Sequence, residues 1–256
     1  MKLLQAELMK LWTVRSPKVL VATSAFIALI AAVIQIIIIE TRDGDPTLSA
    51  GQIAGLLAGS AAAIPLAAFI GAIGATSEIR HRTEYLDHLL TPTRWPQVAA
   101  RFGAYLLFGL IFAAVLLASL LLTVLAWAFV RVGEVPWGST PTRILLGVAL
   151  ATAVYTAIGL AIGSIFRNQI LAVALLAAWV FVIEGFLVLP LAVIDLRLTS
   201  LLPVQAIYAL LIDDALDNTE IGSISYGVWP TAGIMCTWMV GLSAIGMWRT
   251  LKSEIS

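Results

Sequence analysis

Six long apolar runs, almost free of charged residues, constrain this chain more than any other feature. They cover residues 19–39, 50–75, 102–130, 144–165, 170–194 and 229–248. About 20 apolar residues in a helix are enough to cross the hydrocarbon core of a bilayer. The runs are too long and too uniformly apolar for membrane strands, which alternate apolar and polar residues. The sequence therefore predicts an all-α integral membrane protein with six transmembrane helices.

Composition excludes several other classes of protein. Hydrophobic residues make up 61% of the chain and charged residues 12%, whereas soluble domains have about 45–50% and about 25%. The formal net charge is zero, so the chain has no basic excess for binding nucleic acid. The segments between the runs are too short to fold separately. We therefore expect residues 1–256 to form a single transmembrane domain.

Positive charge is distributed unequally between the two sides of the predicted membrane. Eleven Lys and Arg residues lie before the first run, between the second and third, between the fourth and fifth, and after the sixth. The remaining connections hold four. Because cytoplasmic loops carry the excess of Lys and Arg, this bias predicts a multi-pass protein of the cytoplasmic membrane with both termini cytoplasmic.

The N-terminal segment has the pattern of a helix that lies in the membrane interface. Leu4, Leu8, Leu11 and Trp12 share one helical face, as in amphipathic interfacial helices. Pro17 is expected to separate this helix from the first span. Two readings stay open: an elbow helix that braces the first span, or a simple positive anchor.

The longest cytoplasmic connection predicts a second amphipathic helix. Ser77 is a plausible N-cap, and Pro92 ends the pattern. The apolar stripe between them consists of Ile79, Leu86, Leu89 and Leu90. The spacing of Glu78, His81, Glu84 and His88 also suits metal ligands, but Arg80 and Arg82 lie among them and no second liganding helix is evident. A helix that contacts a partner is the better explanation, and no metal site is predicted.

A shorter apolar segment precedes the last run. Leu198–Ile212 is interrupted by Pro203 and has too few residues to span the membrane. A further crossing would also place the C-terminus outside, against the charge bias. We therefore expect short, broken helices dipping into the outer leaflet.

Two features lie inside the predicted spans. Gly51, Gly55 and Gly59 recur every four residues in the second run, as do Gly159 and Gly163 in the fourth. This spacing allows close helix packing, here expected within one subunit rather than between subunits.

Glu184 is the only charged residue well inside a run. Intramembrane carboxylates are costly and commonly functional, so Glu184 is a candidate for a substrate pathway. The alternatives are a hydrogen bond in helix packing and a position near water.

A family resemblance accompanies this layout. The helix with Glu78, Arg80 and Thr83, the motif Leu90-x-Pro92-x-Arg94, and Arg101 resemble permeases of the type-2 ABC exporter family. The resemblance implies that residues 77–91 act as a coupling helix docked in a groove of a separate ATPase, with Phe166–Gln169 as a second, minor contact. The expected ATPase contacts are Glu78, Ile79, Arg80, Thr83, Glu84, Leu86, Leu89, Leu90 and Arg167.

The same resemblance implies an assembly of two permease chains, as homodimer or heterodimer, with two ATPases that export lipids, drugs or peptides. The sequence has no Gly-x-x-x-x-Gly-Lys-Ser/Thr phosphate loop, so ATP and Mg are expected on the partner ATPase, with no cofactor and no catalytic residue on this chain.

Three other classes of membrane protein fit the sequence less well. A secondary transporter usually has more spans, internal repeats and helices broken in pairs, none of which the sequence indicates. An intramembrane hydrolase needs a nucleophile with a His or paired acids inside the spans, whereas both His residues lie in the connection between the second and third runs. A scaffold subunit without transport activity remains an alternative.

Overall fold

The computed structural model describes residues 2–42, 50–80, 94–132, 137–216 and 226–252. Within these ranges all regular structure is helical, and no strand occurs. The α-helices are α1 (Lys2–Thr13), α2 (Arg15–Arg42), α3 (Ala50–Ala58), α4 (Leu66–Arg80), α6 (Arg94–Val132), α7 (Ser139–Phe166), α8 (Gln169–Ala178), α9 (Glu184–Ile194), α10 (Pro203–Leu216) and α11 (Val228–Lys252). Two 3₁₀ segments, Gly59–Ala63 and Leu196–Leu201, and a π-helical turn, Trp179–Ile183, complete the order.

Six helical segments are long and apolar enough to cross a membrane, as predicted. They are Arg15–Thr41, Gly51–Ser77, Trp95–Arg131, Ser139–Phe166, Gln169–Ile194 and Val228–Lys252. Each contains or closely matches one of the six runs identified in the sequence. The described part of the chain is therefore all-α, and its six candidate spans indicate a multi-pass membrane protein.

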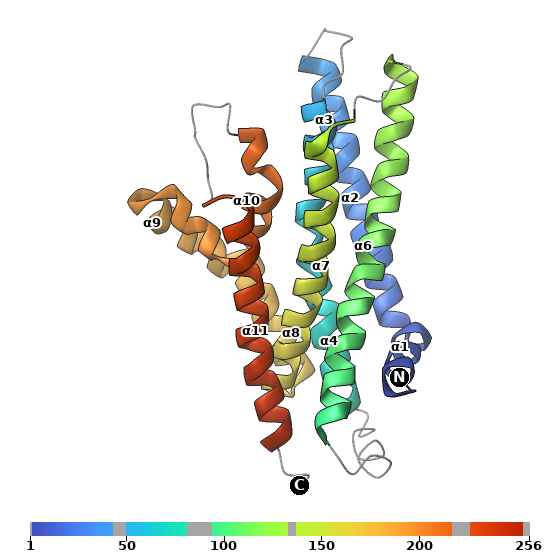
Figure 1. Cartoon of the computed structure of the whole chain (residues 1–256), viewed down its shortest axis with the longest axis vertical. Helices are drawn as coiled ribbons and strands as arrows, with labels where there is room; N and C mark the ends of the chain where they lie inside the picture. The colour runs from blue at the N-terminus through green and yellow to red at the C-terminus, as the bar shows by residue number, and fades with distance from the viewer. Residues whose placement is uncertain (1, 43–49, 81–93, 133–136, 217–225, 253–256) are drawn as a thin grey trace.

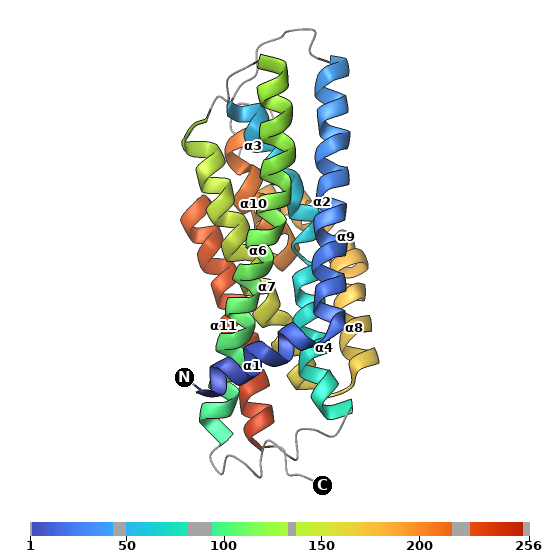
Figure 2. The same cartoon turned by 90° about the vertical axis from the view of Figure 1, so that its right-hand side faces the viewer.

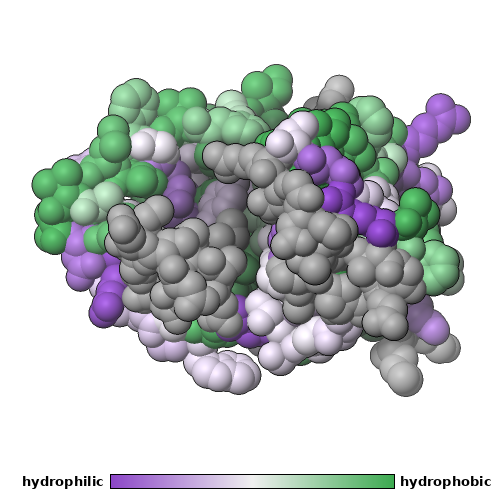
Figure 3. Space-filling model, turned by 90° about the horizontal axis from the view of Figure 1, so that it is seen from above, coloured by the Kyte–Doolittle hydropathy of each residue, from purple (hydrophilic) through white to green (hydrophobic). Residues whose placement is uncertain are grey.

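Helix α7 forms the centre of the bundle. It packs most extensively against α4, α6 and α11 (Figure 1). In the apolar part of this span 78% of the residues are buried, against 17% in the first and last spans. The outer helices thus direct much of their apolar surface away from the protein, and hydrophobic residues reach the outline of the molecule in the end-on view of Figure 3. Such a surface suits contact with lipid chains.

Small residues allow α4 and α7 to approach closely. A Cβ atom added to Gly159 would overlap the carbonyl oxygen of Ala68, and one added to Gly163 would lie 2.7 Å from the Cβ of Ala75. The predicted packing within one chain is thereby confirmed for both glycines. Gly55 behaves differently, since an added Cβ would meet nothing within 4 Å. Gly71, which the sequence pattern did not single out, lies against the Thr156 carbonyl.

The N-terminal helix joins the bundle at one end. Figure 2 shows α1 running across the lower end of the long helices. It contacts α6, and Leu11 is buried with 4% of its surface exposed. The break between α1 and α2 lies at Val14 rather than at Pro17 as expected. Pro17 instead occupies the first turn of α2, where a proline ring is tolerated because no intrahelical N–H bond is needed.

The second and fifth spans are not regular α-helices throughout. The second changes to 3₁₀ geometry at Gly59–Ala63, just before Pro65. The fifth passes through a π-helical turn between α8 and α9 and contains Pro190. Both proline and π-turns are established causes of helix bending, and α9 leans away from the bundle in Figure 1.

After α9 the chain forms the two short helical pieces that the sequence predicted. The 3₁₀ segment Leu196–Leu201 is followed by α10, which begins at Pro203. Proline suits the first position of a helix because its fixed φ is helical and it has no N–H to leave unbonded. The location of these pieces in the outer leaflet stays a prediction.

The helix ends fall into two groups. The start of α1, the end of α4, the start of α6, the α7–α8 turn and the end of α11 lie at the lower end in Figures 1 and 2. At the opposite end, Glu40 of α2 forms an ion pair with Arg131 of α6, and the Trp127 indole N–H donates to Glu40 Oε1 at 3.0 Å. The helix ends that adjoin the segments with eleven of the Lys and Arg residues therefore lie together at the lower end.

Candidate functional site

The region expected to contact an ATPase begins in the last turn of α4. This helix continues through Ser77 to Arg80, and the Ser77 hydroxyl donates to the Gly74 carbonyl at 2.9 Å. The expected N-cap at Ser77 is therefore wrong: the side chain bonds back to the preceding turn of the same helix, as serine hydroxyls do inside helices. Glu78, Ile79 and Arg80 close α4. The other expected contacts on this segment, Thr83, Glu84, Leu86, Leu89 and Leu90, lie outside the described residues, as do His81 and His88.

Arg101 connects α6 to α4 next to this region. Its Nη2 atom donates to the carbonyls of Gly74 and Ala75 at 3.3 and 3.2 Å. Gly74 also faces the Tyr105 ring of α6, which an added Cβ would overlap. The two helices that flank residues 81–93 are thus held together at the end where that connection begins and ends.

Arg167, the remaining expected contact, lies in a sharp turn at the same end of the bundle. Its φ angle is 52°, in the left-handed region, and its N–H donates to the Gly163 carbonyl at 3.0 Å. The next residue, Asn168, caps α8: its Oδ1 accepts from the N–H groups of Ile170 and Leu171 at 3.0 and 3.2 Å. Both helix ends are satisfied in this turn, so Phe166–Gln169 is a defined turn with Arg167 at its centre.

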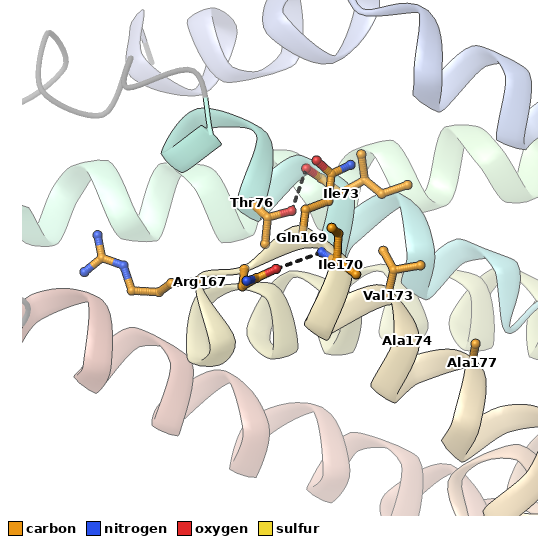
Figure 4. A pocket seen from close by; sticks show the side chains of 9 residues that line it. Ile73, Thr76, Arg167, Gln169, Ile170, Val173, Ala174 and Ala177 are labelled. Atoms are coloured by element: carbon orange, nitrogen blue, oxygen red, sulfur yellow. Dashed lines mark hydrogen bonds between the residues drawn. The ribbon is translucent and has the colours of Figure 1, made fainter.

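A groove of about 800 Å³ lies between α4 and α8 beside this turn. Figure 4 shows its lining side chains. The polar ones are Thr76, Arg167, Asn168 and Gln169, and the apolar ones are Ile73, Ile170, Val173, Ala174 and Ala177. Along α8 the lining changes from polar at the turn to apolar at Ala177. The groove is therefore amphiphilic along its length.

Glu184, the pathway candidate, is buried at the junction of the π-turn and α9, with 1% of its surface exposed. Its carboxylate accepts the indole N–H of Trp179 at 2.5 Å. It also accepts the backbone N–H of Val204 at 3.1 and 2.9 Å and that of Gln205 at 3.3 Å. These N–H groups belong to the first turn of α10, where a negative charge is favourable. Glu184 thus acts as a cap supplied by another helix.

Two tryptophans extend this network toward α11. The rings of Trp179 and Trp238 lie 6.4 Å apart at 58°, within the range of favourable aromatic pairs. The Trp238 indole N–H donates to the Leu201 carbonyl at 2.9 Å. The network joins the fifth span, the short helical pieces and the last span.

This geometry favours a packing role for Glu184, because all of its contacts hold helices together. A second buried polar group, the Tyr155 side chain of α7, is 3% exposed. Among the described protein atoms its hydroxyl has no hydrogen-bond partner. Buried polar groups usually have a partner, so the Tyr155 hydroxyl, unlike the Glu184 carboxylate, has unused hydrogen-bonding capacity.

Comparison with known proteins assigns this chain to no family. No protein-family model matches the chain, and no curated protein has a significantly similar sequence.

Proposed function

We propose that this chain is the membrane-spanning subunit of a type-2 ABC exporter. It moves a lipid, drug or peptide-like substrate across the cytoplasmic membrane with a separate ATPase subunit. The observation that carries the proposal is the resemblance of residues 78–101, with Leu90-x-Pro92-x-Arg94, to the coupling region of such permeases. In support, the helices that flank this region end beside the α7–α8 turn, at the end of the bundle with the larger count of Lys and Arg.

Each end of the bundle has a part in this proposal. Helix α1 is the interfacial elbow, and residues 77–91 form the coupling helix that docks into the ATPase. Arg167 in the α7–α8 turn makes the second, minor contact. The 3₁₀ segment Leu196–Leu201 and α10 lie in the outer leaflet before the last span. Both termini are cytoplasmic.

The energy source lies on another chain in this proposal. The sequence has no phosphate loop, so ATP and Mg bind to the ATPase. The family resemblance implies that two permease chains assemble with two ATPases.

A secondary transporter is a second candidate, on the basis of one observation. The sequence predicted no paired breaks, yet α-helical geometry is interrupted in the second and the fifth span, the middle spans of the two halves. Interruptions at corresponding positions are typical of secondary transporters. Dependence of transport on ATP or on an ion gradient distinguishes the two candidates.

The test of the proposed function compares two variants of the coupling helix. The tagged chain is purified from its native membranes, and vanadate-sensitive ATP turnover is measured in the eluate. Apolar anchors at the centre of an interface usually contribute more than rim charges. We therefore expect Leu86→Asp to abolish both ATPase recovery and turnover, and Arg80→Ala to reduce them slightly. Full recovery and turnover with Leu86→Asp, while the protein remains folded in the membrane, would contradict the coupling-helix assignment.

A further inference from the structure

Helix α9 makes few contacts with the rest of the bundle. It packs mainly against the π-turn before it and the 3₁₀ segment Leu196–Leu201 after it. Glu184 is its only buried residue. The apolar side chains further along are exposed, Phe186 at 75%, Leu189 at 71% and Val193 at 87%. Figure 1 shows α9 projecting from the bundle. An element with so few buried contacts is expected to have low local stability.

The apolar side chains of α9 do not hold it in one direction. Lipid chains are as apolar as these side chains, so packing them against the bundle gains little in a membrane. Polar groups behave differently, because a buried carboxylate or N–H without a partner is costly. The direction of α9 is therefore set by the hydrogen bonds at its base, which Glu184 makes to the first turn of α10.

The base of α9 also contains a hinge. The Glu184 N–H donates to the Trp179 carbonyl five residues earlier and closes the π-turn. The Trp179 indole N–H donates to the Glu184 carboxylate, so this carboxylate bonds to the π-turn on one side and to α10 on the other. Helices bend at π-turns, which are frequent at functional sites. A Cβ added to Gly185 would meet nothing within 4 Å, so close neighbours do not confine the base.

We propose that Glu184 is a latch that fixes the direction of α9, and that α9 swings about the π-turn when the hydrogen bonds of Glu184 open. Extended backbone at Asp195, after α9, allows the chain to follow this motion. The bond from the Trp238 indole N–H to the Leu201 carbonyl joins the following segment to α11. It is a neutral hydrogen bond and is expected to be weaker than those to the carboxylate. The inference does not depend on the proposed function, because the latch is a property of the fold.

The expected motion is large enough to measure. Helix α9 has 11 residues and is therefore about 16 Å long at 1.5 Å per residue. A change in direction of about 20° at the π-turn, the lower limit of a sharp kink, moves its far end by about 6 Å.

The test is a distance measurement between two spin labels on the full-length chain in lipid nanodiscs, in a Cys236→Ala background and with labelled chains diluted in unlabelled ones. One label is attached at Val193 of α9 and the other at Leu146 of α7, which is 68% exposed. We expect one narrow distance distribution when Glu184 is present. Glu184→Ala should add a population displaced by about 6 Å or more. A reference pair joins Leu146 to Leu122 of α6, which is 74% exposed, and should not change.

Two further variants control the comparison. Glu184→Gln keeps one acceptor oxygen and should populate the displaced position less than Glu184→Ala does. Glu40→Ala removes a carboxylate that joins α2 to α6 and should leave the distance from Val193 to Leu146 unchanged.

An unchanged distance from Val193 to Leu146 in Glu184→Ala would overturn the proposal. Equal broadening of both label pairs would also overturn it, because Glu184 would then stabilise the bundle as a whole. Where Glu184→Ala does not fold, the comparison rests on Glu184→Gln, and the absence of a displaced population in that variant overturns the proposal.

Discussion

At the scale of single residues, Glu184 shows how a buried charge can be structural. Its carboxylate replaces the water that would otherwise bond to the first N–H groups of α10. Leaving such donors unbonded in an apolar environment is costly. The sequence revealed that a carboxylate inside a span needs a partner, but it could not reveal that the partner lies 20 residues further along. That pairing depends on the bend of the fifth span and the fold of the segment after it.

The first prediction concerns Glu184→Gln. A glutamine keeps one oxygen but presents an NH₂ group where the second oxygen accepts hydrogen bonds, so the α10 cap is partly lost. We expect the free energy of unfolding to fall by about 1–3 kcal/mol, the cost of leaving a buried partner unbonded. Thermal unfolding in detergent measures the loss, and Glu40→Gln, at a half-exposed carboxylate, should cost less. Unchanged stability with an altered pH dependence of transport would instead favour the pathway hypothesis.

The second prediction uses two glycines with the same place in the sequence pattern but different surroundings. Gly159→Ala forces a Cβ into the Ala68 backbone of α4, which should destabilise the protein by about 1–3 kcal/mol. Gly55→Ala meets nothing within 4 Å and should leave the unfolding temperature unchanged or raise it, since alanine favours helix. The comparison is made by thermal unfolding of both variants in one detergent. Equal effects of the two substitutions would contradict the described α4–α7 contact.

At the scale of elements, the sequence predicted the spans well and their internal geometry poorly. Length and apolarity are enough to predict a spanning helix. In the bilayer the backbone N–H and C=O groups have no water to bond to, so they must bond to one another within the helix. The extension of α4 past Ser77 and the break at Val14 depend on which helix each end contacts, and single residues such as Ser77 or Pro17 are compatible with both outcomes. Pro65 follows the 3₁₀ segment of the second span, but a proline alone determines neither the position nor the length of such a segment.

The small-residue pattern illustrates the same limit. Spacing every four residues indicates that a helix approaches another closely, but it does not identify the partner. Gly159 and Gly163 face α4, whereas Gly55 faces open space. The partner glycine Gly71 lies outside any four-residue repeat that the sequence pattern singled out. For the candidate site, the sequence identified Arg167 and Glu184 as noteworthy, but neither the groove beside Arg167 nor the cap made by Glu184.

The third prediction concerns the attachment of α1. Leu11 is 4% exposed and packs in the core, whereas Met9 of the same helix is 65% exposed. If α1 is held by the bundle as well as by the membrane, Leu11→Ala should cost about 2 kcal/mol or more, and Met9→Ala should cost much less. Protease accessibility of the α1–α2 junction at Val14 measures directly whether α1 detaches from the bundle. Equal protection in both variants would show that the membrane alone holds α1.

At the scale of the whole molecule, the fold shows where the segments with the excess of Lys and Arg lie. The helix ends with the larger count of Lys and Arg lie at one end of the bundle, together with both described chain ends. Since positive residues favour the cytoplasmic side, one end is expected to face the cytoplasm as a unit. We expect the orientation of the chain and the proposed ATPase contact to follow from this same asymmetry.

The fourth prediction tests that orientation with single cysteines in a Cys236→Ala background. Cysteines at Asp45 and Glu134 should react with an impermeant thiol reagent added to intact cells. Cysteines at Glu84 and Ser253 should react only after the membrane is opened. Labelling at Glu84 from outside would reverse the topology and remove residues 77–91 from the side where ATP is available.

The most direct test of the central claim is ATP turnover by the purified chain, alone and together with an ABC-type ATPase recovered from the same membranes. Since the sequence has no phosphate loop, we predict no turnover by the isolated chain and vanadate-sensitive turnover only when the ATPase is present. Robust ATP hydrolysis by the isolated polypeptide, or substrate transport that continues without any ATPase and follows an ion gradient, would contradict the account.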